Sequence, residues 1–334
     1  MPDLLLEIFS EEIPARMQRR AAEDLKALVT DGLVKAGLTY EGAKSFCTPR
    51  RLALTVNGLT ARSPDRKDER KGPRVGAPAK ALEGFVKGSG LSSIDDAKIR
   101  TDPKKGDFYV AVIEQKGKNA QDIISILVPD VIAKFPWPKS MKWASKRMRW
   151  VRPLHSIVCT FGSDLEETEI INFSVEGINS SNQTRGHRFH SDGDVTVKRF
   201  EDYVAILEKN HVILDQQRRI DNIKADCESL AFAQGFELVN DAALLEEVSG
   251  LVEWPVVLMG CFDQAYLELP DEVIQTTIRE NQKCFVLRDP STGKLANRFL
   301  LISNLEATDG GETIIKGNEK VIHARLADAR FFWN

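Results

Sequence analysis

The stretch Leu4-Leu5-Leu6-Glu7-Ile8-Phe9, which continues as Ser10-Glu11-Glu12-Ile13-Pro14, opens the chain and decides how the fold begins. The apolar run is short and strand-like in composition, so we expect a strand. Pro14 then starts a stretch with apolar residues at helical spacing that runs to Ala36, and Gly37 stops it. The chain therefore begins as strand, turn and helix.

The rest of the first half predicts a mixture of strands and helices. Residues 46–59 alternate weakly and predict a strand, whereas the charged residues 63–78, with their glycines and prolines, predict an exposed loop. The other expected elements are a short helix at 79–87, a strand at 107–114, a helix at 120–135, and a strand at 148–161 that can pair with 169–173.

Helical periodicity dominates from Phe200 onward, and strands return later. The expected helices are 200–209, 215–234, 244–248, 271–280 and 311–332, and the expected strands are 251–259, 283–287 and 298–302. We therefore predict an α+β, multi-domain protein with mixed-sheet domains and a helical insertion. Its parts are residues 1–195, which include a basic Trp-rich segment, and residues 196–334.

Length and composition support this class of protein. A chain of 334 residues exceeds what one hydrophobic core usually serves, so we expect two domains or three small ones. With 42% apolar and 28% charged residues, the chain is neither disordered nor collagen-like. Its apolar runs are too short for a membrane helix, and Asp3 and Glu7 stand where a signal peptide carries Lys or Arg. We expect a soluble cytoplasmic protein with reduced cysteines and no membrane partner.

Positive charge is concentrated in two stretches although the net charge is −3. Residues 44–74 hold nine Lys or Arg against three acids, and residues 134–152 hold seven with no acid. The second stretch also carries Trp137, Trp143 and Trp150. Cations against phosphates and indoles against unpaired bases favour RNA binding. Buried tryptophans beside surface lysines are an equally compatible interpretation.

The sequence carries no phosphate-binding loop of the Walker A or G-x-G-x-x-G type and no H-E-x-x-H motif. His187 and His190 are the close histidine pair, but Arg185 and Arg188 flank them and would repel a cation, which disfavours a metal site. An anion or an RNA backbone fits this cluster better. A turn whose His and Arg side chains bind local carbonyls fits it as well.

Several acidic residues have two interpretations. We expect Glu11 and Glu12 to stabilise the start of the helix after Pro14, because carboxylates favour the positive end of the helix dipole. Glu253 lies inside the apolar run Val252-Glu253-Trp254-Pro255. It is either paired with a basic residue in the interior or faces a functional cleft.

Adjacent Arg50 and Arg51 follow Pro49 at the start of an expected strand, so their side chains should project to opposite faces. We predict that one pairs with Glu7, Glu11 or Glu12 inside the fold, because a buried Arg on a sheet needs a carboxylate. The other should stay outside and act in an assembly.

Taken in order, the motifs of the whole chain closely resemble the N-terminal half of the β subunit of bacterial heterotetrameric glycyl-tRNA synthetase. The motifs are Leu6-Glu7-Ile8, Glu11-Glu12-Ile13-Pro14, Pro49-Arg50-Arg51-Leu52-Ala53-Leu54, Met141-Lys142-Trp143, Val151-Arg152-Pro153-Leu154-His155, Arg185-Gly186-His187-Arg188-Phe189, 244–248, 251–257, Gln282-Lys283, 317–321 and 325–329.

The resemblance implies an α₂β₂ ligase in which the α subunit holds the active site and uses ATP and Mg²⁺, while the β subunit is needed for binding of tRNA-Gly. It also implies that the chain stops before an HD-type domain. Three positions depart from the family pattern: Lys142, commonly Arg; Cys284, commonly aromatic; and His323, often basic or Pro. The second weakens any stacking role at that position.

The resemblance assigns this chain no catalytic residue, no metal and no cofactor of its own. The candidates for contact with tRNA or with the α subunit are Arg50, Arg51, Lys139, Lys142, Lys146, Arg147, Arg149, Arg152, Arg185, His187 and Arg188. The sequence leaves two alternatives open. One is a free-standing RNA-binding module, and the other is an editing-type hydrolytic domain with a pocket near His187 or Glu253.

Overall fold

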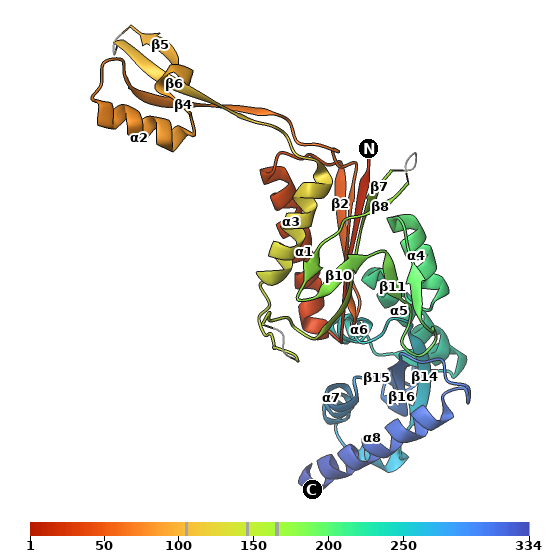
Figure 1. Cartoon of the computed structure of the whole chain (residues 1–334). Coiled ribbons are helices and arrows are strands. Elements are labelled where there is room, and N and C mark those ends of the chain that lie inside the picture. Colours follow the sequence, from red (N-terminus) through yellow and green to blue (C-terminus); the bar gives the residue numbers. More distant parts are fainter. Residues whose placement is uncertain (104–105, 145–146, 164–166, 334) are drawn as a thin grey trace.

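The computed structural model describes residues 1–103, 106–144, 147–163 and 167–333. Figure 1 shows a central sheet between helices, an arm that projects from one end, and a smaller body at the other end. We call these parts the central body (residues 1–61 and 120–214), the arm (62–119) and the C-terminal body (215–333). The predicted α+β class with several mixed or antiparallel sheets is confirmed.

The central sheet runs in the order β2-β3-β1-β7-β10-β9, and β8 pairs with β7. Its pairings are antiparallel except for β10 against β7. The strands are β1 (Asp3–Ser10), β2 (Gly42–Cys47), β3 (Arg51–Asn57), β7 (Leu154–Gly162), β8 (Glu169–Ile170), β9 (Ser174–Val175) and β10 (Ile178–Ser181).

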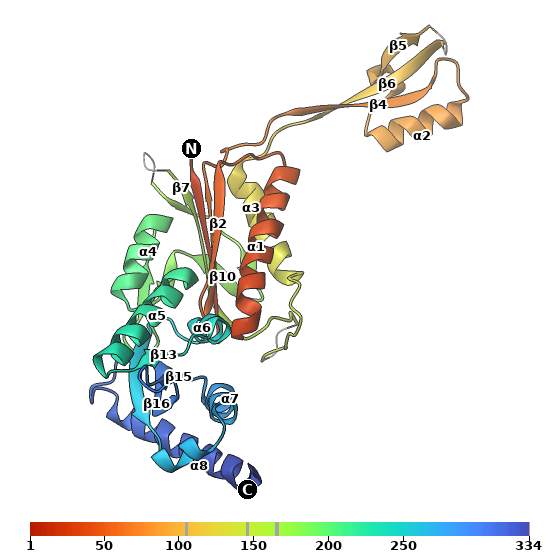
Figure 2. The same ribbon diagram turned by 180° about the vertical axis from the view of Figure 1, so that it is seen from behind.

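Strand β1 is buried on both faces, which explains its nearly continuous apolar sequence. Leu4, Leu6 and Ile8 enter the core beneath helices α1 (Ala15–Lys35) and α3 (Ala120–Ala133). Figure 2 shows these two helices on one face of the sheet. Helix α1 ends at the predicted place, where Gly37 adopts a φ of 89°.

Leu5 of β1 packs on the opposite face beneath helix α4 (Phe200–Lys209). Tyr203 and Leu207 of α4 are buried against this face. A short antiparallel pair, β11 (Gln183–Arg185) and β12 (Asp194–Thr196), leads into the helix. Although α4 follows residue 195, it packs on the central sheet.

The arm is a three-stranded antiparallel sheet in the order β4-β6-β5 with one helix against it. Both views show it projecting well away from the central sheet (Figures 1 and 2). Its elements are β4 (Arg66–Arg74), α2 (Ala79–Ser89), η1 (Ile94–Asp96), β5 (Lys98–Asp102) and β6 (Gly106–Gln115).

The exposed loop expected at 63–78 is therefore wrong, because most of it forms β4. The side chains of this strand are largely exposed and charged, so no apolar alternation marks it. Its partner β6 lies about forty residues away along the chain, with Arg70 opposite Ala111. Phe85 of α2 packs where Gly72 leaves room, since a Cβ there would lie 2.6 Å from its ring.

The C-terminal body is an antiparallel sheet in the order β13-β15-β16-β14 with helices around it. Its strands are β13 (Glu237–Leu238), β14 (Val256–Cys261), β15 (Phe285–Arg288) and β16 (Leu295–Ser303). Its helices are α5 (Gln216–Ala233), α6 (Ala242–Ser249), η2 (Gln264–Glu268), α7 (Asp271–Gln282) and α8 (Glu312–Trp333). Helices α5 and α6 pack on one side of the sheet, and α7 and α8 pack on the other.

Three expected strands are shorter than predicted for one physical reason. The stretch 46–59 contains the end of β2, a turn at Pro49 and the whole of β3. Strand β7 starts only after Pro153, and β14 starts only after Pro255. Proline has no N–H to donate to a sheet, so it marks the strand boundary in each case. The segments before these prolines are loops, and two of these loops carry Thr48 and Glu253.

Candidate functional site

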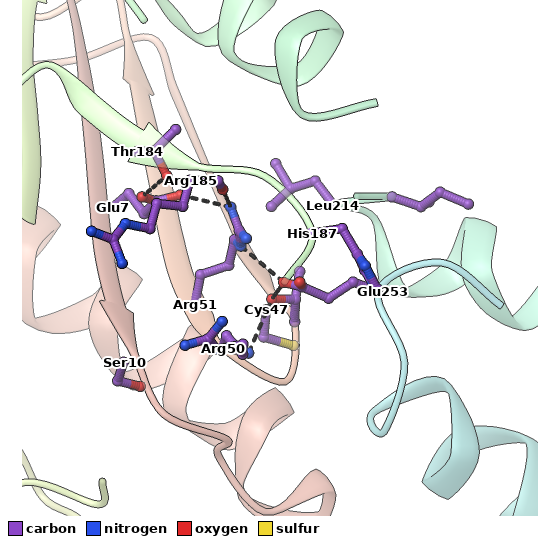
Figure 3. Close-up of polar contacts among 12 residues, drawn as sticks. Glu7, Ser10, Cys47, Arg50, Arg51, Thr184, Arg185, His187, Leu214 and Glu253 are labelled. Atoms are coloured by element: carbon purple, nitrogen blue, oxygen red, sulfur yellow. Dashed lines mark hydrogen bonds and ion pairs between the residues drawn. The ribbon is translucent and has the colours of Figure 1, made fainter. Parts of the chain in front are cut away.

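The side chain of Arg51, at the first residue of β3, is completely buried between two carboxylates (Figure 3). Its Nη1 lies 3.3 Å from Oε2 of Glu7 on the neighbouring strand β1. Its Nε lies 3.0 Å from Oε1 of Glu253, which comes from the loop between α6 and β14. Nη1 also donates to the backbone oxygen of Arg185. One guanidinium therefore joins the central sheet to the C-terminal body.

Glu7 is fully buried and accepts hydrogen bonds from three groups. Besides Arg51, Thr184 Oγ1 donates to Oε1, and the Tyr203 hydroxyl donates to Oε2. These donors come from β3, β11 and α4. A buried carboxylate is tolerated when it is paired and hydrogen-bonded in this way.

Glu253 also has hydrogen-bond donors inside the protein, and both of them meet its Oε1. Thr48 Oγ1 donates to Oε1 over 2.6 Å, and Arg51 donates to the same oxygen. Of the two interpretations of Glu253, pairing with a basic residue in the interior is confirmed. Burial alone would raise the pKa of this carboxyl, but the charge of Arg51 and the bonds from Thr48 and Arg51 hold it below its usual value.

Arg50 also pairs with a carboxylate, at the edge of the same site. Its Nη2 lies 3.5 Å from Glu11 Oε1, and its guanidinium lies 4.7 Å from the centre of the Phe9 ring. The prediction that one of the two arginines pairs with Glu7, Glu11 or Glu12 is confirmed for Arg51. The expectation that the other stays outside is wrong, because the Arg50 side chain is only 13% exposed.

Glu11 and Glu12 do not cap helix α1, contrary to expectation. Helix α1 begins after Pro14 with no side-chain cap and no acid in its first turn. Glu11 instead accepts from His155, and Glu12 pairs with Arg188. Burial alone would raise the pKa of Glu11, but the bond from His155 and the charge of Arg50 lower it overall.

His187 is buried at the junction of the central body and the C-terminal body. Its hydrogen-bond partners determine which ring nitrogen carries the proton. The backbone N–H of Phe189 donates to Nδ1, so the ring proton lies on Nε2 and is donated to Asn304 Oδ1 over 3.0 Å. The same Asn304 oxygen accepts from the backbone N–H groups of Glu253 and Trp254. Desolvation lowers the pKa of His187 and favours this neutral form.

The remaining members of the Arg-Gly-His-Arg cluster are at the surface and paired. Arg185 pairs with Asp194 across the β11–β12 hairpin, and Arg188 pairs with Glu12. His190 stacks on His187 with 4.8 Å between ring centres. Because His187 and Glu253 are buried and bonded to protein groups, the geometry does not support an editing-type pocket at either residue.

The three tryptophans of the basic segment belong to the protein core or pack against it. Trp150 is fully buried, and its ring meets those of Phe135 and Trp137 at centre distances of 5.0 and 5.1 Å. Trp137 and Trp143 are partly buried against the same core. Of the two interpretations of this segment, the one with a buried tryptophan therefore holds for Trp150.

The cations of this segment stand apart from its buried tryptophans. Lys139, Lys142 and Arg147 are exposed, and within the described residues none of them pairs with a carboxylate. Arg149 is also exposed and donates to Ser140 Oγ and to its backbone oxygen, while Arg152 is half-buried. Lys146 lies outside the described residues.

The sequence candidates thus separate into two groups. Arg50, Arg185 and Arg188 lie around the buried network, whereas Lys139, Lys142, Arg147 and Arg149 form an unpaired or loosely held surface. Arg51 and His187 are buried, so in this structure neither side chain is accessible to tRNA or to another subunit. In the part of the chain that the structure describes, no three His, Cys, Asp or Glu residues group as metal ligands, and no helix is long and apolar enough to cross a membrane.

Sequence reasoning missed Arg219 of α5, which is also completely buried. It donates to the carbonyl oxygens of Cys47, Ile213, Leu214 and Ser249, and so holds α5 against the end of β2. Burial lowers its pKa to about 10. Its neighbour Arg218 is exposed and pairs with Glu208, so nothing local in the sequence distinguishes the two.

Comparison with known proteins agrees with this arrangement of motifs. A family model described as glycyl-tRNA synthetase beta subunit matches residues 4–334. The chain belongs to this family. The glycine–tRNA ligase beta subunit of Paracoccus denitrificans (strain Pd 1222) is 52% identical over 333 residues. That match covers 100% of this chain and 48% of the relative, so the chain spans about half the length of that glycyl-tRNA synthetase beta subunit.

The resemblance found in the sequence is therefore confirmed for this beta-subunit family. The motifs Leu6-Glu7-Ile8, Pro49-Arg50-Arg51 and Val252-Glu253-Trp254-Pro255, far apart in the sequence, meet in one buried network. In this chain, these residues have a structural role.

We expect Arg51→Ala to lower the free energy of unfolding by about 3–5 kcal/mol, because it leaves Glu7 and Glu253 buried without their shared cation. Arg50→Ala, which loses a partly exposed pair, should cost about 1 kcal/mol. Denaturant unfolding measures both. Exposed Arg218→Ala serves as the control, and an Arg51→Ala variant as stable as that control would contradict the role of the network.

Stability should fall as the pH is lowered, first through the histidine range and then through the carboxylate range. The pKa values of His187 and Glu253 are both lowered by folding, so the unfolded chain takes up protons first. The stabilisation is present above the unfolded values, roughly pH 6.5 for His and 4.3 for Glu, and is lost below them. Urea midpoints at about pH 8, 6 and 5 measure the histidine part of this loss, and midpoints at about pH 4 and 3 measure the carboxylate part.

The variant His187→Gln keeps a donor for Asn304 but cannot titrate, so it should lose less stability than the wild type between pH 8 and 5. The exposed His323 offers a matched control as His323→Gln. Equal losses for wild type and His187→Gln would show that the buried imidazole is not responsible.

Proposed function

We propose that this chain acts as the N-terminal half of the non-catalytic β subunit of a cytoplasmic glycine–tRNA ligase with α₂β₂ assembly. In this proposal it is needed for binding tRNA-Gly and for assembly with the catalytic α subunit, which uses ATP and Mg²⁺ to glycylate the tRNA. Membership of the beta-subunit family supports the proposal.

The tRNA-binding part of the proposal rests on the charge of residues 134–152, which is positive throughout. This segment has no acidic residue, and Lys139, Lys142 and Arg147 are exposed without carboxylate partners in the described part of the chain. A surface that served solubility alone would mix charges of both signs. Phosphates are the partners that such an unpaired surface fits.

The assembly part rests on the fold of the arm. Its sheet and helix share little core with the rest of the chain and project away from it (Figure 1). An element that shares so little core contributes little to the stability of the rest of the chain. A projecting element of this kind is suited to contact with another molecule. Gel filtration of the chain with and without the α subunit distinguishes a synthetase subunit, which co-elutes, from a free-standing RNA-binding module, which does not.

The isolated chain should show no glycine-dependent exchange between ATP and pyrophosphate, because its sequence has no adenylate-forming motif. Exchange should appear when the catalytic α subunit is added. The measurement is incorporation of labelled pyrophosphate into ATP. Exchange by the chain alone, above a blank without enzyme, would contradict a non-catalytic role.

Binding of tRNA-Gly should weaken as salt rises, and Lys142→Ala should lower the slope of log K against log salt by roughly 0.7 to 0.9. Arg149→Ala should do the same, with a further effect from the lost contacts to Ser140. Fluorescence anisotropy titrations at KCl concentrations from roughly 50 to 200 mM give this slope.

The matched control is Lys134→Ala, since Lys134 is exposed in the same segment but already pairs with Asp130. It should leave the slope close to that of the wild type. If Lys142→Ala also leaves affinity and slope unchanged, this segment is a solvated surface without a role in tRNA binding.

A further inference from the structure

A cavity of about 330 Å³ lies between the first turns of helix α1 and the segment 135–139. Its lining joins aromatic and apolar groups to three cations. The lining includes Arg16, Arg20 and Asp24 of α1, and Phe135, Trp137 and Lys139 of the segment that faces it.

The aromatic side of the cavity is held rigidly from behind. The rings of Phe135 and Trp137 lie 4.9 Å apart, and Trp137 meets the buried Trp150 edge-on at 5.1 Å. A backbone bridge between Met141 and Trp150 closes the loop behind them. Trp137 is only half-buried, so this fixed cluster reaches the cavity.

The cations on the α1 side of the cavity destabilise helix α1 when no anion is bound near them. Arg16, Arg19 and Arg20 lie in its first two turns, where the helix dipole favours negative charge. The acids that precede the helix do not offset them, because Glu11 and Glu12 bind His155 and Arg188. A bound anion at this helix start would satisfy both the dipole and the arginines.

The cations of the rim are available for such an anion. Arg20 is 78% exposed and its Nε is 3.7 Å from Asp24, an exposed pair that contributes little. Arg16 pairs with no carboxylate among the residues that the structure describes, and Lys139 is exposed on the opposite side of the cavity. The combination of an aromatic surface and several exposed cations matches an unpaired base together with its phosphates.

We propose that this cavity binds one unpaired nucleotide of an RNA strand, with its base against Trp137 and its phosphates at Arg16, Arg20 and Lys139. The inference deepens the proposed tRNA binding and rests on it. It assigns a role to arginines of α1 that the sequence did not single out, and it gives Trp137 a function distinct from that of buried Trp150.

The test uses the whole chain and a labelled single-stranded hexauridylate, with binding followed by fluorescence anisotropy. Arg16→Ala and Arg20→Ala should each weaken binding and lower the salt slope by about 0.7. Trp137→Leu should weaken binding roughly five- to 150-fold through lost stacking. The control is Arg19→Ala, because Arg19 lies on the same turns but pairs with Glu246 outside this cavity.

Because Trp137 packs on Trp150, its variant is also checked by thermal melting, and the two arginine variants decide the question if Trp137→Leu unfolds. Wild-type affinity in Arg16→Ala and Arg20→Ala overturns the inference. Inorganic pyrophosphate is the second probe. If it displaces hexauridylate at equal phosphate concentration, the base contributes nothing and the nucleotide assignment is wrong.

A parallel titration with tRNA-Gly separates this inference from the proposed function. Binding of tRNA without binding of hexauridylate overturns the nucleotide cavity and leaves the proposed function standing. Binding of hexauridylate that depends on Arg16 and Arg20, without binding of tRNA, supports the cavity and overturns the proposed role in tRNA binding. If neither RNA binds, both are wrong.

Discussion

The arrangement of this chain depends on the burial of one charged side chain, Arg51. A guanidinium cannot lose its proton at ordinary pH, so it needs carboxylate or carbonyl oxygens as partners wherever the fold removes it from water. Glu7 on the adjacent strand supplies one, and Glu253 supplies the other from a loop two hundred residues later. The C-terminal body therefore has to dock against the end of the central sheet for the network to be complete. A glycine at position 250 permits the close approach, since a Cβ there would lie 2.7 Å from that of Ala15.

The same constraint sorts the cations of the chain into two kinds. Arg51 and Arg219 are held in the interior by carboxylates or by backbone carbonyls, and they serve the fold. Lys139 and Lys142 remain in water without such partners in the described residues, so they stay available to an anion. A count of basic residues along the sequence does not separate the buried cations from the exposed ones. The distinction matters because a cation already paired inside the protein contributes little to counterion release on RNA binding.

Much of the fold could be predicted from local patterns. The first strand, helix α1 with its stop at Gly37, and the α+β class follow from apolar spacing and from glycine and proline positions. In the arm, helix α2 and strand β6 were predicted, but the sheet was not. Strand β4 buries few apolar side chains and is defined by its hydrogen bonds to β6. For the candidate site, the pairing of one arginine with an N-terminal acid could be predicted. The burial of His187 could not be predicted, because its local sequence is compatible both with a surface turn and with a buried junction between two bodies.

The sequence by itself determined the family, the order of most elements and the concentration of positive charge in residues 134–152, because each is a property of neighbouring residues. Only the tertiary structure decided which member of each adjacent pair, Arg50 with Arg51 and Arg218 with Arg219, is completely buried. It also placed Glu253 opposite Arg51, and the arginines of α1 beside Trp137. These outcomes depend on contacts between segments far apart in the chain. The free energy of a charged side chain is set by its surroundings in space, which neighbouring residues do not specify.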